Sequence, residues 1–138
     1  SADALARELS ALLASPDPEL RDDIAYSGLV AWMYRDRVLS RPTLESLADQ
    51  WYRNLSTGLG ERGTDSIFVR SFSALSLGIV AALDNDAPFM ERDEFERLLV
   101  AALTYFGAER DIRGFDPDRG WMHSVAHTAR TDIAGSYR

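Results

Sequence analysis

The sequence contains no cysteine, no lysine and no long uninterrupted apolar run. Without cysteine the chain has no disulfide, no thiolate metal ligand and no cysteine nucleophile. All 15 basic residues are arginines, and 22 acidic residues outnumber them, which gives a formal net charge of -7. Nucleic acids are bound mainly by basic side chains that neutralise phosphates, so this balance argues against a nucleic-acid partner.

The longest uncharged run, 71–83, is shorter than the roughly 20 residues that span a bilayer, and it includes three serines. The opening residues SADALAREL carry charges and lack the apolar core of a signal peptide. From the sequence we therefore expect a soluble, cytoplasmic protein with no membrane partner.

Helical periodicity runs along the whole chain, and no segment alternates convincingly with a period of two. With 138 residues and 46% hydrophobic side chains, the chain fits one all-helical domain over 1–138. Capping residues, prolines and glycine-rich turns mark the expected boundaries. The predicted helices cover about 3–14, 18–38, 42–55, 65–83 and 92–108, and a sixth follows the turn GFDPDRG.

The fourth predicted helix is apolar over most of its circumference, which places it in the middle of the fold. Asp23 with Tyr26 and Asp65 with Phe68 recur 42 residues apart, close to the roughly 40–47-residue period of helical-hairpin repeats. We therefore predict an all-α fold of the αα-superhelix type, HEAT-like, with about six helices. A compact helical bundle is the alternative.

Three ordered segments carry a family resemblance: PELRDDIAYSGLVAW (18–32), GTDSIFVRSFSAL (63–75) and ERDIRGFDPDRGWMHSVAHTA (109–129). Together they resemble the bacterial domain of unknown function 2785 family, in order, across about 17–129. The resemblance implies an all-helical, repeat-like fold and no established activity. The pattern typical of that family in the last segment is Gly-Trp, a His, three residues, a second His, and then an Asp where this chain has Arg130.

The two histidines, His123 and His127, lie four residues apart and share one flank of the sixth predicted helix with Arg130. An Asp at that position would complete a set of ligands suited to zinc or iron. The guanidinium of Arg130 instead opposes a divalent cation, so a third ligand has to come from another helix, with Asp23 and Asp65 the best candidates. We predict no metal and no cofactor; His123, His127 and Asp65 form the alternative metal set.

The matching turns before helices two, four and six are expected to bring polar and aromatic side chains to one concave side of the molecule. The predicted binding groove consists of Asp23, Tyr26, Asp65, Arg70, Trp121, His123 and His127. Each has a purely structural alternative. Asp65 would cap its helix, Arg70 would be solvated or paired locally, Trp121 would pack on the preceding turn, and the histidines would form hydrogen bonds at a helix interface.

Mixed acids, arginine and aromatic side chains suit an amphipathic ligand better than a polyanion. We therefore interpret the protein as a non-enzymatic binding module for a small molecule or a peptide, with no catalytic residues. The alternative is a metal-dependent hydrolase in which His123, His127 and a carboxylate hold a metal whose bound water is the nucleophile. No serine-nucleophile, phosphate-loop or dinucleotide-binding motif points to another enzyme class.

A second copy of the chain is the remaining expected partner. Only GSYR follows the sixth predicted helix, and a helical stack without a capping unit leaves apolar surface exposed. We therefore expect a homodimer formed through the fifth or the sixth helix.

Overall fold

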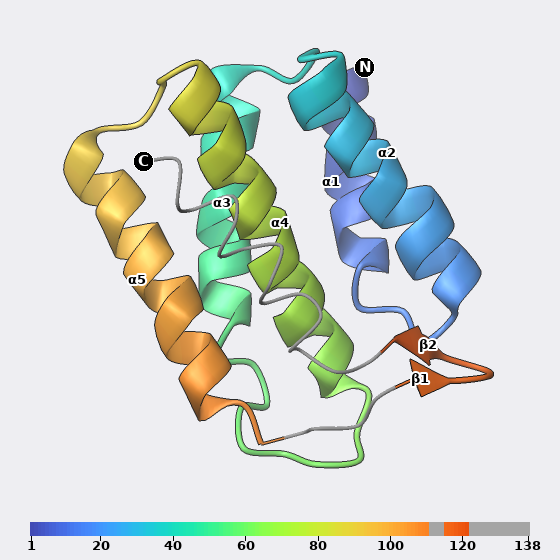
Figure 1. The fold of residues 1–138 in the computed structure, drawn as a ribbon. Coiled ribbons are helices and arrows are strands. Elements are labelled where there is room, and N and C mark those ends of the chain that lie inside the picture. Colours follow the sequence, from blue (N-terminus) through green and yellow to red (C-terminus); the bar gives the residue numbers. More distant parts are fainter. Residues whose placement is uncertain (111–114, 122–138) are drawn as a thin grey trace.

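The computed structural model describes residues 1–110 and 115–121, and this part of the chain is helical apart from one short hairpin (Figure 1). Successive helices run in opposite directions, so neighbours in the sequence lie antiparallel. The elements are α1 (Ala2–Leu12), η1 (Glu19–Tyr26), α2 (Ser27–Val30), η2 (Ala31–Arg35), α3 (Arg41–Asn54), α4 (Ser66–Asp86), α5 (Arg92–Ala108), β1 (Phe115–Asp116) and β2 (Gly120–Trp121). The predicted all-α class is confirmed, whereas the hairpin superhelix stays a prediction.

The second helix is continuous but not uniformly α-helical, since η1 and η2 are π-helical and α2 joins them. Its buried residues are Arg21, Ala25, Leu29 and Met33, each four positions after the last. In an α-helix such a row drifts around the axis by about 40° per step. The wider π turns hold more residues, which keeps this row directed at the rest of the fold.

Helix α4 occupies the centre of the molecule, with α3 behind it and α2 and α5 on its two sides (Figure 1). By length and composition it would be able to cross a membrane, with a mean hydropathy of 1.8 over an 18-residue window. However, 78% of that window is buried inside the protein. The core helix of a globular fold has the same character, which agrees with the central position predicted from its apolar circumference.

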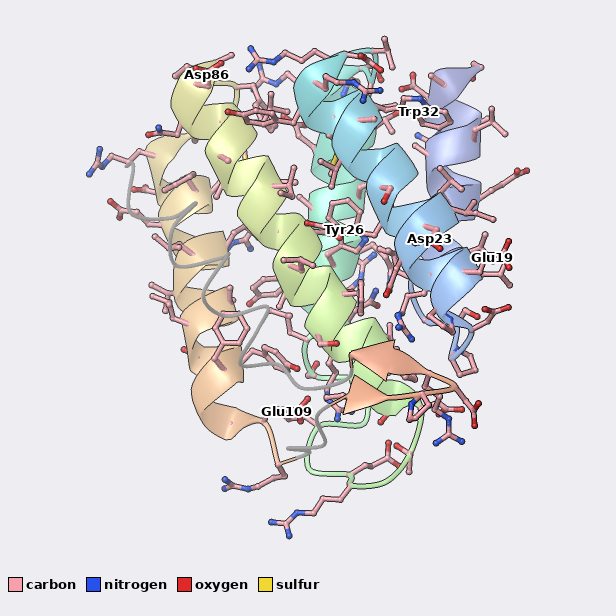
Figure 2. The ribbon with its side chains drawn as sticks, turned by 45° about the vertical axis from the view of Figure 1, so that its right-hand side comes forward. Glu19, Asp23, Tyr26, Trp32, Asp86 and Glu109 are labelled. Carbon is pink, nitrogen blue, oxygen red and sulfur yellow. The ribbon has the colours of Figure 1, made fainter. Side chains whose placement is uncertain are left out.

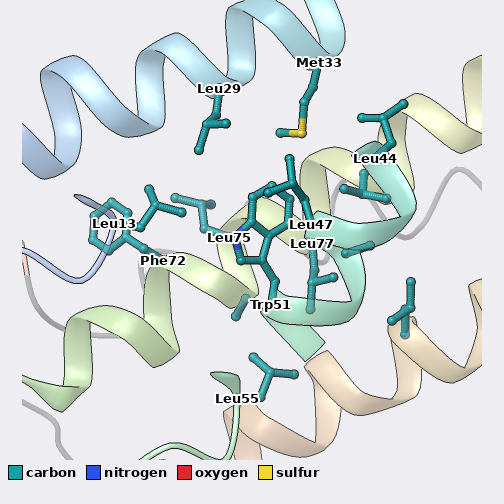
Figure 3. Close-up of a cluster of buried hydrophobic side chains, with 14 of the residues drawn as sticks. Leu13, Leu29, Met33, Leu44, Leu47, Trp51, Leu55, Phe72, Leu75 and Leu77 are labelled. Atoms are coloured by element: carbon teal, nitrogen blue, oxygen red, sulfur yellow. The ribbon is translucent and has the colours of Figure 1, made fainter. Parts of the chain in front are cut away.

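The core is centred on Trp51 of α3, whose side chain is fully buried (Figure 3). Leu29 and Met33 cover it from the second helix, and Leu75 approaches from α4. The indole Nε1 donates a hydrogen bond of 2.9 Å to Oγ of Ser10 in α1. A buried tryptophan needs such a partner for its one donor, so this bond fixes α1 against α3.

The predicted boundaries agree closely with the helices, and α5 has the predicted bounds. Helix α3 begins where the sequence indicates, because Ser40 caps it and Pro42 stands in its first turn. The sixth predicted helix lies outside the described residues. The β1–β2 pairing joins Phe115 with Trp121 and Asp116 with Gly120, so the predicted turn forms a short hairpin that the helical periodicity does not predict.

Candidate functional site

The two predicted groove residues of η1 differ in exposure. Asp23 is exposed on the outer side of the helix, whereas Tyr26 is half-buried between the second helix and α4 (Figure 2). The Tyr26 ring meets the Phe72 ring edge to face, with 5.9 Å between the centroids. Packing therefore accounts for the position of Tyr26, and its carboxylate neighbour Asp23 faces solvent.

Asp65 precedes α4 and is about half exposed, with Oδ1 3.7 Å from Nε of Arg119. It occupies the N-cap position, yet its side chain makes no capping hydrogen bond. The carboxylate therefore associates with the turn of the β1–β2 hairpin instead of capping the helix.

Arg70 is fully buried and does not line an open groove. Its Nε and Nη2 donate to the two carboxylate oxygens of Glu109, over 2.9 and 3.1 Å. Nη1 donates to the carbonyls of Thr57 and Gly58 and to Oγ of Ser66. One guanidinium thus joins the loop after α3, the first turn of α4 and the C-cap of α5. Arg70 is therefore neither solvated nor paired locally along the chain, and its role in the fold is that of a buried, long-range ion pair.

Tyr105 completes this buried cluster, because its hydroxyl donates a hydrogen bond of 2.7 Å to Oε1 of Glu109. Burial, and then the hydrogen bond to Glu109, raise the pKa of the Tyr105 phenol far above its usual value. The phenol is therefore held neutral as a donor, and it is not available as a general base.

The remaining predicted site residues are placed only in part. Trp121 belongs to β2, where its backbone pairs with Phe115. His123, His127 and Arg130 lie outside the described residues, so the histidine pair is not placed relative to Asp65. Within 1–110 and 115–121, no three acidic or histidine side chains gather to hold a metal ion.

Arg21 is a buried residue that is not among the predicted site residues. Its guanidinium lies over two aromatic rings of α4, 4.2 Å from the centroid of Phe68 and 4.9 Å from that of Phe72. It also pairs with the carboxylate of Asp22 and donates to the carbonyl of Arg119 in the hairpin turn. Arg21 therefore holds the β1–β2 hairpin against the second helix. One arginine in a helix is normally solvated, so the sequence contains no signal for this role.

A groove of about 550 Å³ lies between the C-terminal halves of α3 and α5. Its lining is mainly apolar, and its polar groups include hydroxyls and one guanidinium. The lining residues are Tyr52, Arg53, Leu55, Ser56, Leu59, Ala101, Thr104, Tyr105 and Ala108. The groove is not among the predicted site residues, because leucines and alanines at helical spacing are indistinguishable from core positions in a sequence.

The groove and the buried ion pair share one residue. The ring of Tyr105 contributes to the groove wall, while its hydroxyl contacts Glu109. One wall of the groove is therefore connected, through Tyr105 and Glu109, to the hydrogen bonds around Arg70. A mainly apolar hollow with a few polar groups in its lining is typical of a small-molecule site.

Comparison with protein-family models gives a match, over residues 55–133, to the family described as protein of unknown function (DUF2785). The match includes two of the three segments that carry the resemblance, and 18–32 lies outside it. Neither curated proteins nor solved structures give a match. Because the family model covers more than half of the chain, the protein belongs to the DUF2785 family.

Proposed function

We propose that this protein is a non-enzymatic binding module that holds a small amphipathic molecule in the groove between α3 and α5. The observation that carries the proposal is the volume and lining of that groove, about 550 Å³ with mostly apolar walls. Small-molecule sites commonly enclose roughly 300–1,000 Å³ and place a few polar groups within such walls.

The polar groups of the groove favour a ligand with an apolar body and a hydrogen-bonding or anionic head. Ser56 and Thr104 offer hydroxyls, and Arg53 offers a guanidinium that already bonds to Asp49 and Gln50. Because these bonds partly neutralise the guanidinium, it can orient a ligand that has a single anionic group, and a polyanion is not needed. The apolar body would then lie against Leu55 and Leu59.

The wall of the groove offers a position at which a substitution can block ligand binding. Ala101 contributes a half-buried methyl group to its wall. A leucine at this position would extend into the hollow and exclude a ligand, while helix propensity is nearly unchanged. Ala11 of α1 offers a matched control, because it lines a separate hollow of about 370 Å³ between α1 and α3.

The test uses 1-anilinonaphthalene-8-sulfonate, which combines an apolar ring system with an anionic group. We expect its fluorescence to rise on saturable binding to the folded protein, and Ala101→Leu to abolish that rise. Ala11→Leu should bind the probe as the unmodified protein does. Equal binding by Ala101→Leu, with unchanged circular dichroism, would contradict the proposal.

The sequence-based alternative, a metal-dependent hydrolase using His123, His127 and Asp65, has a separate test. Metal analysis of protein purified without chelator should give no stoichiometric metal. Added zinc should also leave the melting temperature unchanged, because only a ligand that prefers the native state raises it. A zinc-dependent rise that disappears in both His123→Ala and His127→Ala would favour the hydrolase.

A further inference from the structure

The outer face of α5 carries a regular line of exposed residues. Asp93, Glu96, Val100, Leu103 and Gly107 are all exposed, and they follow one another at alternating spacings of three and four. We call this line the α5 stripe. Such spacing is that of the contact positions between two packed helices, and it keeps one face directed at a partner.

The middle of the α5 stripe is apolar although it faces solvent. Val100 is 61% exposed and Leu103 is 47% exposed. Gly107 adds a small position, since no heavy atom of the described chain lies within 4 Å of where a β-carbon would stand. Nothing inside the described molecule therefore requires glycine there, whereas a second helix would approach more closely over it.

Acidic side chains lie near the start of α5, where Glu96 also pairs with Arg92, and an exposed arginine follows the end of the helix. Asp93 and Glu96 lie in the N-terminal half of α5, and Arg110 follows its C-cap Glu109. In a parallel pair of such helices, acid would face acid and arginine would face arginine. In an antiparallel pair, each acidic end meets the arginine of the other copy. The two helix dipoles then point in opposite directions, which is favourable.

We infer that the α5 stripe is a homodimer interface in which two copies of α5 pack antiparallel about a two-fold axis. A two-fold interface is self-complementary, so a contact between residue i and residue j occurs twice. With the axis between Val100 and Leu103, the valine of one copy faces the leucine of the other. The same register brings Asp93 to the end that carries Arg110 of the second copy.

A contact made by one helix from each copy buries less area than the roughly 1,200 Å² that stable complexes begin from. The dimer is therefore weak and depends on concentration. The groove between α3 and α5 is lined by other residues of α5, so the dimer and the ligand site are tested with different substitutions.

Sedimentation equilibrium over a micromolar concentration series tests the inference. We expect the mass to rise from 15.4 kDa towards twice that value as the concentration increases. Leu103→Glu should hold the protein at the monomer mass throughout. Leu5→Glu is the matched control, since Leu5 of α1 is 49% exposed and lies outside the α5 stripe. Monomer at every concentration, or equal effects of both substitutions, would overturn the inference.

A charge exchange tests the antiparallel register itself. Asp93→Arg and Arg110→Asp should each weaken dimerisation, because each places like charges opposite one another. The double variant restores opposite charges and should recover the dimer, with circular dichroism unchanged in all three proteins. Failure of the double variant to recover the dimer, while both single variants lose it, would reject the antiparallel arrangement.

Discussion

At the scale of single residues, the carboxylate of Glu109 is the counter-charge of the fully buried Arg70. Glu109→Gln leaves that guanidinium without its charged partner. We expect the free energy of unfolding to fall by about 3 kcal/mol or more, since breaking a buried pair leaves an uncompensated charge. Urea denaturation followed by circular dichroism measures the change.

A matched exposed pair gives the control for this substitution. Arg41 and Glu45 form an ion pair one helical turn apart, with both side chains partly exposed. Glu45→Gln should cost no more than about 0.5 kcal/mol. Replacing both buried partners, in Arg70→Met with Glu109→Leu, should recover part of the loss. Equal losses in Glu109→Gln and Glu45→Gln would show that the buried pair does not anchor the loop.

The environment of Tyr105 predicts that the free energy of unfolding falls at alkaline pH. Its pKa is raised in the folded protein, so the native state favours the neutral phenol. The associated stability is present below the ordinary tyrosine pKa of about 10 and is lost as the pH rises above it. The free energy of unfolding should then fall by up to about 1.4 kcal/mol per pH unit from this group. Tyr105→Phe should reduce that slope, and an unchanged slope between pH 10 and 11 would contradict the assignment.

The sequence indicates residue types better than residue roles. Arg70 is identifiable as unusual because it lies inside an apolar helix, but its partner Glu109 is 39 positions away. No spacing rule links residues so far apart, and ion pairing therefore emerges only from the tertiary fold. Asp65 illustrates the converse, since a typical capping residue at a helix start makes no capping bond here.

At the scale of elements, the loop between α3 and α4 depends on Gly58. This residue has a φ of +63°, and a β-carbon there would stand 2.9 Å from Cβ of Ser66. We expect Gly58→Ala to lower the free energy of unfolding by about 2 kcal/mol, from the left-handed backbone and from the contact together. Thermal and urea denaturation both report this loss.

Gly107 provides the comparison within the same protein. It lies in the last turn of α5, and a β-carbon added there would have no other heavy atom of the described chain within 4 Å. Gly107→Ala should be neutral or should stabilise the monomer by about 0.5 kcal/mol, because alanine has the higher helix propensity. If both substitutions had equal effects, the conformation of the α3–α4 loop would not be the cause.

The helices themselves are predictable, since apolar periodicity, Ser40, Pro42 and the glycine-rich loop set most boundaries of α1, α3, α4 and α5. The π-helical turns of η1 and η2 are not predictable in this way. They differ from α-helix by one residue in the hydrogen-bonding step, and tertiary packing selects them. The groove between α3 and α5 is equally unpredictable from the sequence, because it depends on how the two helices pack.

At the scale of the whole molecule, protection of the backbone amides against hydrogen exchange should be highest at the centre and lower at the edge. Amides of α4 are surrounded by α3, α5 and the second helix, so they should exchange only through global unfolding. Amides of η1 and η2 should exchange faster through local opening. Hydrogen exchange followed by mass spectrometry measures both, and equal rates in α4 and η1 would contradict the central role of α4.

The central position of α4 also constrains how the protein is made. During synthesis the ribosome releases α1, the second helix and α3 before α4, and α5 only afterwards. Leu77, Val80 and Ala81 of α4 line one small cavity together with Phe95 and Leu98 of α5 in the finished molecule. Until α5 has emerged, that side of α4 faces water as a row of apolar side chains. The nascent chain therefore exposes, for a time, apolar surface that the finished protein buries, and such surface is prone to aggregation.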